Sequence, residues 1–438
     1  MTHRLAIDFG TTNSVVARWT ADAHETVSLP GLSADTGETH LIPSLLYVRD
    51  GRTGDVVAGD AVQAGEYDRR QDNRLFRNFK RNISTTSTLE PRIIDGVPWT
   101  EAEAGAHFLK CLLKALPYKT NDIEKLVITV PVAAPENYLA WLQRTLNTLP
   151  PDCMRVVDES TAAALGYAVN DPGTNVLVID FGGGTLDLSL VRLAGSGTSP
   201  RQIFPNQSLA WDGRGSIAQV IAKAGATLGG ADIDQWLLEE VLHRINIPAH
   251  HLGLGYAASL AACESAKIAL STNDAAEILL QPEVGMAPPI LIKRAELEAL
   301  MAQRGFYAAL NQLLDRVLGM AHQQGIFKED ISHVLLVGGT SLIPSVQRAL
   351  DTYFRAITQG RHKIRLPAWP ALHWTVENTT IHVDKPFTAV VEGALQVSAG
   401  LGLDDRLAYS YGLQILDPDA GATRYEEIFP AGSRYPSP

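Results

Sequence analysis

The 438-residue sequence has few cysteines, no long apolar run and no excess of positive charge. Cys111, Cys153 and Cys263 are odd in number and far apart, which argues against a disulfide framework and favours a reducing compartment. No apolar run is long enough to span a bilayer. Residues 1–4 lead directly into a strand-like run, so we expect no signal peptide, no membrane partner and a cytoplasmic location.

The net charge of −11 argues against nucleic acid as the main partner, because phosphate backbones require a basic surface. No Gly-x-x-x-x-Gly-Lys-Ser/Thr sequence is present, which disfavours a P-loop ATPase. Apolar residues make up 45% of the chain, enough for complete cores. The length predicts two or more domains.

The most informative stretch of the sequence is Ile179-Asp180-Phe181-Gly182-Gly183-Gly184-Thr185-Leu186-Asp187. Apolar runs enter and leave it, so it predicts a β-hairpin with a glycine turn. The first strand-like run, Leu5-Ala6-Ile7-Asp8-Phe9-Gly10-Thr11-Thr12-Asn13, has the same arrangement. The two Asp-Phe-Gly stretches are too far apart for a solenoid repeat. They fit two related lobes that each offer one hairpin to a shared cleft. An ordinary tight hairpin is the alternative for either turn alone.

This pair of turns predicts a polyphosphate site. Backbone N–H groups of residues 10–13 and 182–185 can close around an anion, because glycine leaves no Cβ in the way. The hydroxyls of Thr11, Thr12 and Thr185 add donors. Carboxylates beside a phosphate would repel it unless a cation lay between them. We therefore expect Asp8 and Asp180 to hold Mg²⁺ through its water molecules.

A third glycine turn, Gly338-Gly339-Thr340, follows the apolar run 334–337. It is a candidate binding site for the nucleoside, because a residue without a side chain lets a flat ring approach the backbone. A strand–helix turn with no ligand is the alternative.

Apolar periodicity predicts alternating strands and helices, and hence an α/β chain with mixed sheets. Helices are expected over 101–116, 135–149, 158–169, 232–246, 255–271, 293–324 with a break near Gly305, 344–358 and 386–400. Residues 194–215 are interpreted as a surface loop, and residues 360–385 as irregular. A β-hairpin is expected within residues 404–438.

Four motifs in this order resemble the signatures of the DnaK-type (seventy-kilodalton) heat-shock chaperones, in the actin and sugar-kinase ATPase superfamily. They are Ile7–Ser14, Asp158–Ala164, Ile179–Asp187 and Val337–Pro344, with Ala262–Lys267 between the last two. The resemblance covers about residues 4–400, the nucleotide-binding domain. It implies a two-lobed actin-like ATPase fold with a central nucleotide cleft: lobe I over 1–172, lobe II over 173–400 with its last helix packing near lobe I, and a remnant of a β substrate-binding domain over 404–438.

The resemblance also implies roles for individual residues. Lys80 matches the lysine that reaches the γ-phosphate and the attacking water, Glu159 an acid that positions the metal's waters, and Asp187 a carboxylate near the attacking water. Alone, Lys80 would be interpreted as a solvated lysine and Glu159 as a helix-start carboxylate. The family's nucleotide contacts further match Gly229, Gly230, Glu264, Lys267 and Ser271.

The sequence departs from the family pattern at several positions. Two arginines that sandwich the adenine are replaced by Ile268 and Leu342, which puts adenine affinity in doubt. The family has an acid where Ala231 follows Gly229-Gly230, and it has an aspartate near the last helix where this sequence has Phe387. The leucine-rich linker is replaced by residues 402–406, and the α-helical lid is absent.

The resemblance therefore implies a slow chaperone-type ATPase that binds ATP or ADP with Mg²⁺, in which Asp180 or Asp187 orients the attacking water. Unfolded protein clients and co-chaperones are its expected partners. One alternative is a nucleotide-sensing scaffold with little hydrolysis. A weaker one is a small-molecule kinase, for which the sequence reveals no substrate pocket or catalytic base.

Overall fold

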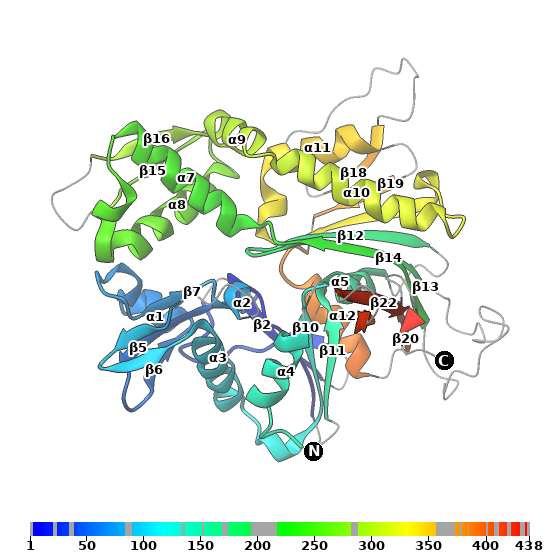
Figure 1. Cartoon of the computed structure of the whole chain (residues 1–438), viewed down its shortest axis with the longest axis horizontal. Coiled ribbons are helices and arrows are strands. Elements are labelled where there is room, and N and C mark those ends of the chain that lie inside the picture. The colour runs from blue at the N-terminus through cyan, green and yellow to red at the C-terminus, as the bar shows by residue number, and fades with distance from the viewer. Residues whose placement is uncertain are drawn as a thin grey trace.

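The structure is a computed structural model of the chain (Figure 1). It describes residues 3–20, 24–34, 39–83, 90–132, 134, 136–150, 153–168, 174–193, 217–281, 288–355, 373–376, 379–383, 385–399, 402–406, 411–417, 422–429 and 434–435. Two large mixed sheets lie at the centres of two lobes. Among the described residues, no helix has both the length and the apolar character needed to cross a bilayer.

A six-stranded sheet forms the centre of lobe I, drawn in blue and cyan in Figure 1. Its strand β1 (His3–Asp8) has a completely buried middle, Leu5-Ala6-Ile7. β1 pairs parallel with β10 (Ile123–Val130) and antiparallel with β2 (Asn13–Trp19), so its carboxyl end meets the first glycine turn. The remaining strands are β11 (Met154–Asp158) beside β10, and β3 (His24–Thr26) and β4 (Ile42–Pro43) beside β2.

An eight-stranded sheet forms the centre of lobe II. β12 (Asn175–Phe181) is buried along its whole length, as expected for a strand covered on both faces. Its antiparallel register with β13 (Leu186–Leu193) places Asp180 directly opposite Asp187. The full order is β18 (His373–Val376), β19 (Thr379–His382), β17 (Ile331–Val337), β12, β13, β14 (Ile217–Ala226), β20 (Gly402–Arg406) and β23 (Arg434–Tyr435).

Helices and small sheets complete each lobe. Lobe I adds β5 (Leu45–Asp50), β6 (Asp55–Ala58), α1 (Asp60–Ala64), β7 (Leu75–Arg77), α2 (Phe79–Asn82), β8 (Arg92–Ile94), β9 (Val97–Trp99), α3 (Glu101–Ala115) and α4 (Glu136–Thr145). Lobe II adds α7 (Gly230–Arg244), α8 (Tyr256–Leu270), β15 (Ala275–Ile278), β16 (Ile290–Lys293), α9 (Arg294–Gln303), α10 (Phe306–His322) and α11 (Pro344–Arg355).

Two helices, α5 (Glu159–Ala168) and α12 (Ala389–Ser398), pack against each other below β12 and β14 in the view of Figure 1. α5 contacts β12 and β13 of lobe II, whereas α12 contacts β1 and β10 of lobe I. The crossing is close because each helix contributes a glycine. A Cβ on Gly393 would lie 1.6 Å from the Ala162 carbonyl oxygen, and one on Gly166 would lie 2.3 Å from that of Ala389. These helices thus connect the two sheets behind the cleft.

Most predicted elements are present within a few residues of their expected bounds, including the break between α9 and α10, where Gly305 has a φ of 77°. The prediction that residues 360–385 are irregular is wrong for residues 373–376 and 379–382, which form β18 and β19. β19 is specified by its pairing with β17, which is distant in sequence, and β18 pairs with β19. The loop predicted over 194–215 lies outside the described residues.

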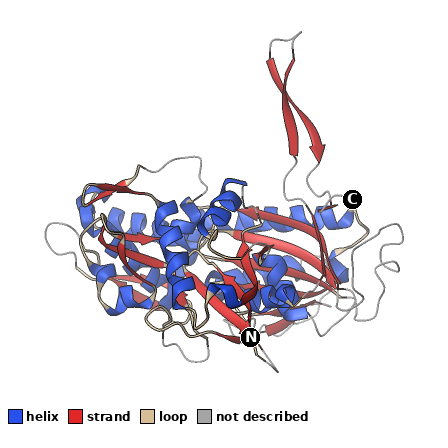
Figure 2. Cartoon of the chain, turned by 90° about the horizontal axis from the view of Figure 1, so that it is seen from below, coloured by secondary structure: helices blue, strands red, loops and turns tan. Residues whose placement is uncertain are grey.

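The C-terminal part contains the predicted hairpin, β21 (Tyr411–Asp417) with β22 (Ala422–Phe429), which extends away from the body in Figure 2. Residues 402–406, which occupy the position of the family's linker, form the strand β20 beside β14. β23 then pairs with β20. The boundaries of the two lobes and of the C-terminal unit remain predictions.

Candidate functional site

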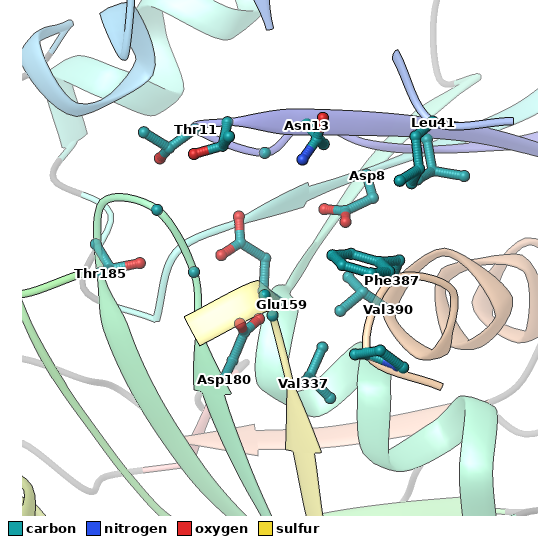
Figure 3. Close-up of a pocket in the computed structure, with 18 of the residues that line it drawn as sticks. Asp8, Thr11, Asn13, Leu41, Glu159, Asp180, Thr185, Val337, Phe387 and Val390 are labelled. Carbon is teal, nitrogen blue, oxygen red and sulfur yellow. The ribbon is translucent and has the colours of Figure 1, made fainter. Parts of the chain in front are cut away.

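Two glycine-rich hairpins face one cavity between the lobes. The turn between β1 and β2 supplies residues 10–13, and the turn between β12 and β13 supplies residues 182, 183 and 185. Figure 3 shows Thr11 and Asn13 on one side and Thr185 across from Thr11. The acids Asp8 and Asp180, which end β1 and precede the second turn, line the same cavity of about 80 Å³.

Close packing between the hairpins explains why these turns carry glycine. A Cβ on Gly183 would lie 2.1 Å from the Thr12 hydroxyl oxygen, and one on Gly184 would lie 2.6 Å from that of Thr11. Gly338, which has a φ of 80°, would bring a Cβ within 2.2 Å of the Phe181 carbonyl oxygen. The backbone amides of both turns are therefore brought together without side chains between them.

Lys80 and Glu159 form a buried ion pair at the floor of the cavity. The Lys80 ammonium donates to Glu159 Oε1, and their side chains are 4% and 9% exposed. Both residues line the cavity together with Asp8 and Asp180. Burial opposes protonation of Lys80, but the nearby charges, Glu159 first, raise its pKa above the usual value. Lys80 therefore stays cationic at the floor of the site.

The acids of the cavity are costly to ionise while no cation is present. Burial, then the charge of Glu159, raises the pKa of Asp8 to about 6, although the Thr129 hydroxyl donates a 2.6 Å hydrogen bond to Asp8 Oδ1. Burial, Glu159 and Asp187 raise the pKa of Asp180 well above its usual range. A cation would remove this penalty, because it favours the charged form of a carboxylate.

Asp187 lies behind the second turn, with 1% of its surface exposed. Neither of its carboxylate oxygens has a hydrogen-bond partner of good geometry among the described residues. Burial and Glu159 raise its pKa to about 7, against a smaller opposing effect of the Thr185 hydroxyl. Asp187 and Gly184 do not line the cavity itself, unlike the other residues predicted for these hairpins.

A second, larger cavity of about 500 Å³ continues from the first. Of the remaining predicted nucleotide-binding residues, Gly338 lines the first cavity, and the second is lined by Gly230, Glu264, Lys267, Ser271, Gly339 and Thr340. Gly229 packs instead against the second turn, where a Cβ would lie 2.6 Å from the Gly183 carbonyl carbon. The three glycine turns and α8 therefore surround one continuous hollow.

Lys267 and Glu264 are not free to act alone, because each is held by a charged partner. Lys267 Nζ lies 2.8 Å from Asp234 Oδ1 and donates to the Gly230 carbonyl oxygen at 3.0 Å. Glu264 accepts from Arg77 of lobe I. A second pair across the lobes joins Arg81 to Asp232 at 2.7 Å. These pairs close the cleft on the side of α7 and α8.

Among the described residues, no group of three or more His, Cys, Asp or Glu side chains could hold a metal ion directly. The predicted Mg²⁺ held through water by Asp8 and Asp180 is a looser arrangement. It remains a prediction.

Comparison with known proteins identifies the family. The profile of the family described as "Hsp70 protein" matches residues 85–200 and 206–361, together more than half of the chain. The chain belongs to the Hsp70 family. This family of chaperone ATPases has the two-lobed actin-like fold, to which the mixed α/β sheets of this structure correspond.

Among curated proteins, this Hsp70-family chain is similar to "Chaperone protein DnaK" of Thermotoga neapolitana and of Thermotoga petrophila. Each is 28% identical over 362 residues, which is 80% of this chain and 55% of the relative. The DnaK of Thermosipho africanus is 28% identical over 370 residues, 80% of this chain and 54% of the relative. The chain thus spans about half the length of the curated relatives it matches.

The structure shows where the departures from the Hsp70 pattern lie. Ile268 and Leu342 line the larger cavity, and Ile268 is 61% exposed. Phe387 lines both cavities, and in Figure 3 its ring lies beside Asp8. An aromatic ring therefore stands beside the acid cluster, where the family has an acid.

Sequence reasoning missed several residues of the site. Asp234, the partner of Lys267, is 4% exposed, although in sequence it is only an acid near the start of a helix. Arg77 gave a usable signal, because it lies three residues before Lys80 in a basic segment. Tyr138, buried behind Lys80, gave none beyond its helical spacing.

Proposed function

We propose that this chain is the nucleotide-binding part of a DnaK-like chaperone ATPase. It binds Mg-ATP between the two hairpins and hydrolyses it slowly, and the nucleotide sets the degree of lobe closure. The observation that carries this proposal is the convergence of two Asp-Phe-Gly hairpins on one cavity with Lys80 at its floor. Membership of the Hsp70 family supports the same assignment.

The residues present fit a magnesium polyphosphate. The glycine turns form a cradle that a Cβ would fill at Gly183, Gly184 and Gly338. Asp8 and Asp180 carry raised pKa values that a cation would lower, and Lys80 offers an ammonium group beside them. Asp187 has two buried oxygens that find no hydrogen-bond partner of good geometry within the described part of the chain, as a carboxylate that pairs with a bound water would have.

The mechanism assigns one task to each group. When bound, Mg-ATP supplies a phosphoryl group for transfer to water. The amides of residues 10–13 and 182–185 donate to phosphate oxygens, and Lys80 stabilises the negative charge that develops. Asp8 and Asp180 hold the cation through its waters.

The proton of the attacking water goes to a carboxylate. Asp180, which lines the cavity, or Asp187, which lies directly opposite it on β13, can accept it. Turnover is expected to be slow, because the bases among the described residues that line the cavity are carboxylates, with no histidine or cysteine among them. Glu264 and Lys267 would contact the ribose and base from α8 once their present partners allow it.

Phosphate release by the purified chain tests the proposal. We expect slow release that falls at least tenfold in Lys80→Met, and no change in Lys110→Ala, which alters an exposed lysine on α3. Lys80→Met leaves Glu159 buried without its cation, a change that can cost about 3–5 kcal/mol of stability. The variant Lys80→Met with Glu159→Gln removes both charges and controls for that loss. Release that does not depend on Lys80 would contradict the mechanism.

A nucleotide-sensing scaffold is the second candidate, and Phe387 favours it. An apolar ring beside Asp8 leaves less room for the ordered waters that hydrolysis requires. Calorimetric titration with ATP, ADP and GTP, with and without Mg²⁺, separates the two functions. Tight magnesium-dependent binding without phosphate release favours the scaffold.

The domain boundaries, partners and cellular location of the chain are part of the same proposal. We expect lobe I over 1–172, lobe II over 173–400 and a substrate-domain remnant over 404–438. Unfolded protein clients and co-chaperones are the proposed partners, and the proposed location is cytoplasmic. Neither nucleic acid nor a membrane is a proposed partner.

A further inference from the structure

Tyr138 is a buried residue for which neither the sequence nor the proposed mechanism provides a role. It lies on α4, and 2% of its surface is exposed. Its ring packs on Trp141, with 5.5 Å between ring centroids, and Trp141 packs on Phe9 at 6.2 Å. The Lys80 ammonium lies 5.5 Å from the centroid of Phe9. Tyr138 therefore belongs to the aromatic layer beneath the floor of the cavity.

The hydroxyl of Tyr138 is buried and has no hydrogen-bond partner among the described residues. Such a group costs stability, and phenylalanine would fill the same space without the cost. The charged groups that act on this hydroxyl are Lys80, Glu159 and Asp8. An unpaired donor therefore lies in the same buried layer that supports Lys80, the cation of the ion pair that the proposed mechanism must open.

Glu159 needs a second partner if Lys80 moves. In this structure its hydrogen bond comes from Lys80, and its side chain is 9% exposed. If Lys80 turns toward a bound phosphate, Glu159 is left buried without a cation, which is strongly unfavourable. Asp8 has less need of a new donor, because Thr129 already donates to it.

We propose that Tyr138 is a positioning residue that donates its hydroxyl to Glu159 when Lys80 turns to the nucleotide. This inference rests on the proposed function for the movement of Lys80. The exchange keeps Glu159 hydrogen-bonded in both states, with Lys80 in the free chain and with Tyr138 in the loaded one. Burial raises the pKa of Tyr138, so the hydroxyl keeps the proton that it must donate.

A cycle of stability measurements tests the exchange without any need for hydrolysis. In the wild-type background, Tyr138→Phe is expected to leave the melting temperature unchanged or to raise it, because the hydroxyl has no partner there. In the Lys80→Met background Glu159 has already lost its cation, so Tyr138→Phe is expected to lower the melting temperature by about 2 °C or more. Equal shifts in the two backgrounds would overturn the proposal.

Steady-state kinetics provide a second, independent test of the role of Tyr138. Tyr138→Phe is expected to lower kcat about tenfold, the effect of one hydrogen bond to a charged group, with KM unchanged because Tyr138 lines neither of the two cavities. Tyr307→Phe is the matched control: it removes a hydroxyl that donates to Ser345 in lobe II at 2.7 Å, and it should leave kcat unchanged. An unchanged kcat in Tyr138→Phe would also overturn the proposal. If the wild type releases no phosphate, the proposed function fails, and the stability cycle still decides the role of Tyr138.

Discussion

Arg77 of β7 and Glu264 of α8 form an ion pair across the cleft, with their side chains 13% and 17% exposed. Arg77 also donates to the Ala257 carbonyl oxygen at 3.2 Å, so it holds the start of α8 as well. A pair this well shielded from solvent is weakened little by salt. It therefore joins the lobes at Glu264, a residue that lines the larger cavity.

Arg77→Ala is expected to open the cleft and to speed nucleotide dissociation by about tenfold, because truncating one partner of a shielded pair acts mainly on the off-rate. Stopped-flow displacement of a fluorescent nucleotide measures the rate. Arg304→Ala breaks an exposed pair with Glu239 within lobe II and should leave the rate unchanged. Equal rates in wild type and Arg77→Ala would show that the pair does not hold the cleft closed.

Asp187 gives a prediction for the pH dependence of stability. Its pKa is about 7 in the folded chain, against an ordinary value of 3.8, so the folded state holds the extra proton between these limits. The stabilising effect of that proton is fully present below pH 4 and is lost as the pH rises through 7. Asp187→Asn should therefore stabilise the free chain by about 1–3 kcal/mol at pH 8 and by little at pH 4.

Urea unfolding at pH 4, 6 and 8 measures this effect. Asp122→Asn, which alters an exposed acid in lobe I, serves as the control and should change stability equally little at all three values. A destabilising effect of Asp187→Asn at pH 8 would mean that the carboxylate has a favourable partner in the folded chain.

The two hairpins and their acids could be predicted from sequence, because each depends on residues that are neighbours in the chain. Three glycines after Asp180-Phe181 specify a turn by backbone sterics alone. The repetition of Asp-Phe-Gly at residues 8–10 indicated that two such turns would meet. Burial of the strands followed from unbroken apolar runs.

Contacts between residues that are far apart in the chain could not be predicted from the sequence. Tyr138 is an ordinary position of a helical segment in sequence, and only the packing of α4 in the lobe I core brings it into the aromatic layer next to Lys80. Asp234 is buried because Lys267 neutralises it from another helix. β19 forms because β17 offers an edge, a pairing that no local pattern encodes.

The helix crossing behind the cleft can be tested with a single methyl group. Gly393→Ala would place its Cβ 1.6 Å from the Ala162 carbonyl oxygen, which forces α12 away from α5. Overpacking of this kind costs about 1–3 kcal/mol or more, so we expect a melting temperature several degrees lower. Gly319→Ala in α10 meets no atom within 4 Å and should stabilise the chain by about 0.5–1 kcal/mol through helix propensity. Similar shifts for both variants would contradict the close crossing.

The larger cavity gives a prediction for base recognition. Ile268 and Leu342 line it with apolar side chains, so the wild type has no guanidinium to stack on a purine from these positions. We expect ATP and GTP to bind with affinities within about threefold of each other, since shared phosphate contacts dominate the binding energy. Calorimetry with both nucleotides in the presence of Mg²⁺ measures the ratio.

Introducing arginine at these positions should add stacking on the base. Ile268→Arg and Leu342→Arg are each expected to strengthen ATP binding by up to about tenfold, the size of a partly desolvated cation–π contact. Ile93→Arg adds the same charge at an exposed apolar position of lobe I, so it controls for general electrostatic attraction of the polyphosphate. If all three variants gain equally, charge alone explains the effect. A gain confined to positions 268 and 342 places the base in the larger cavity.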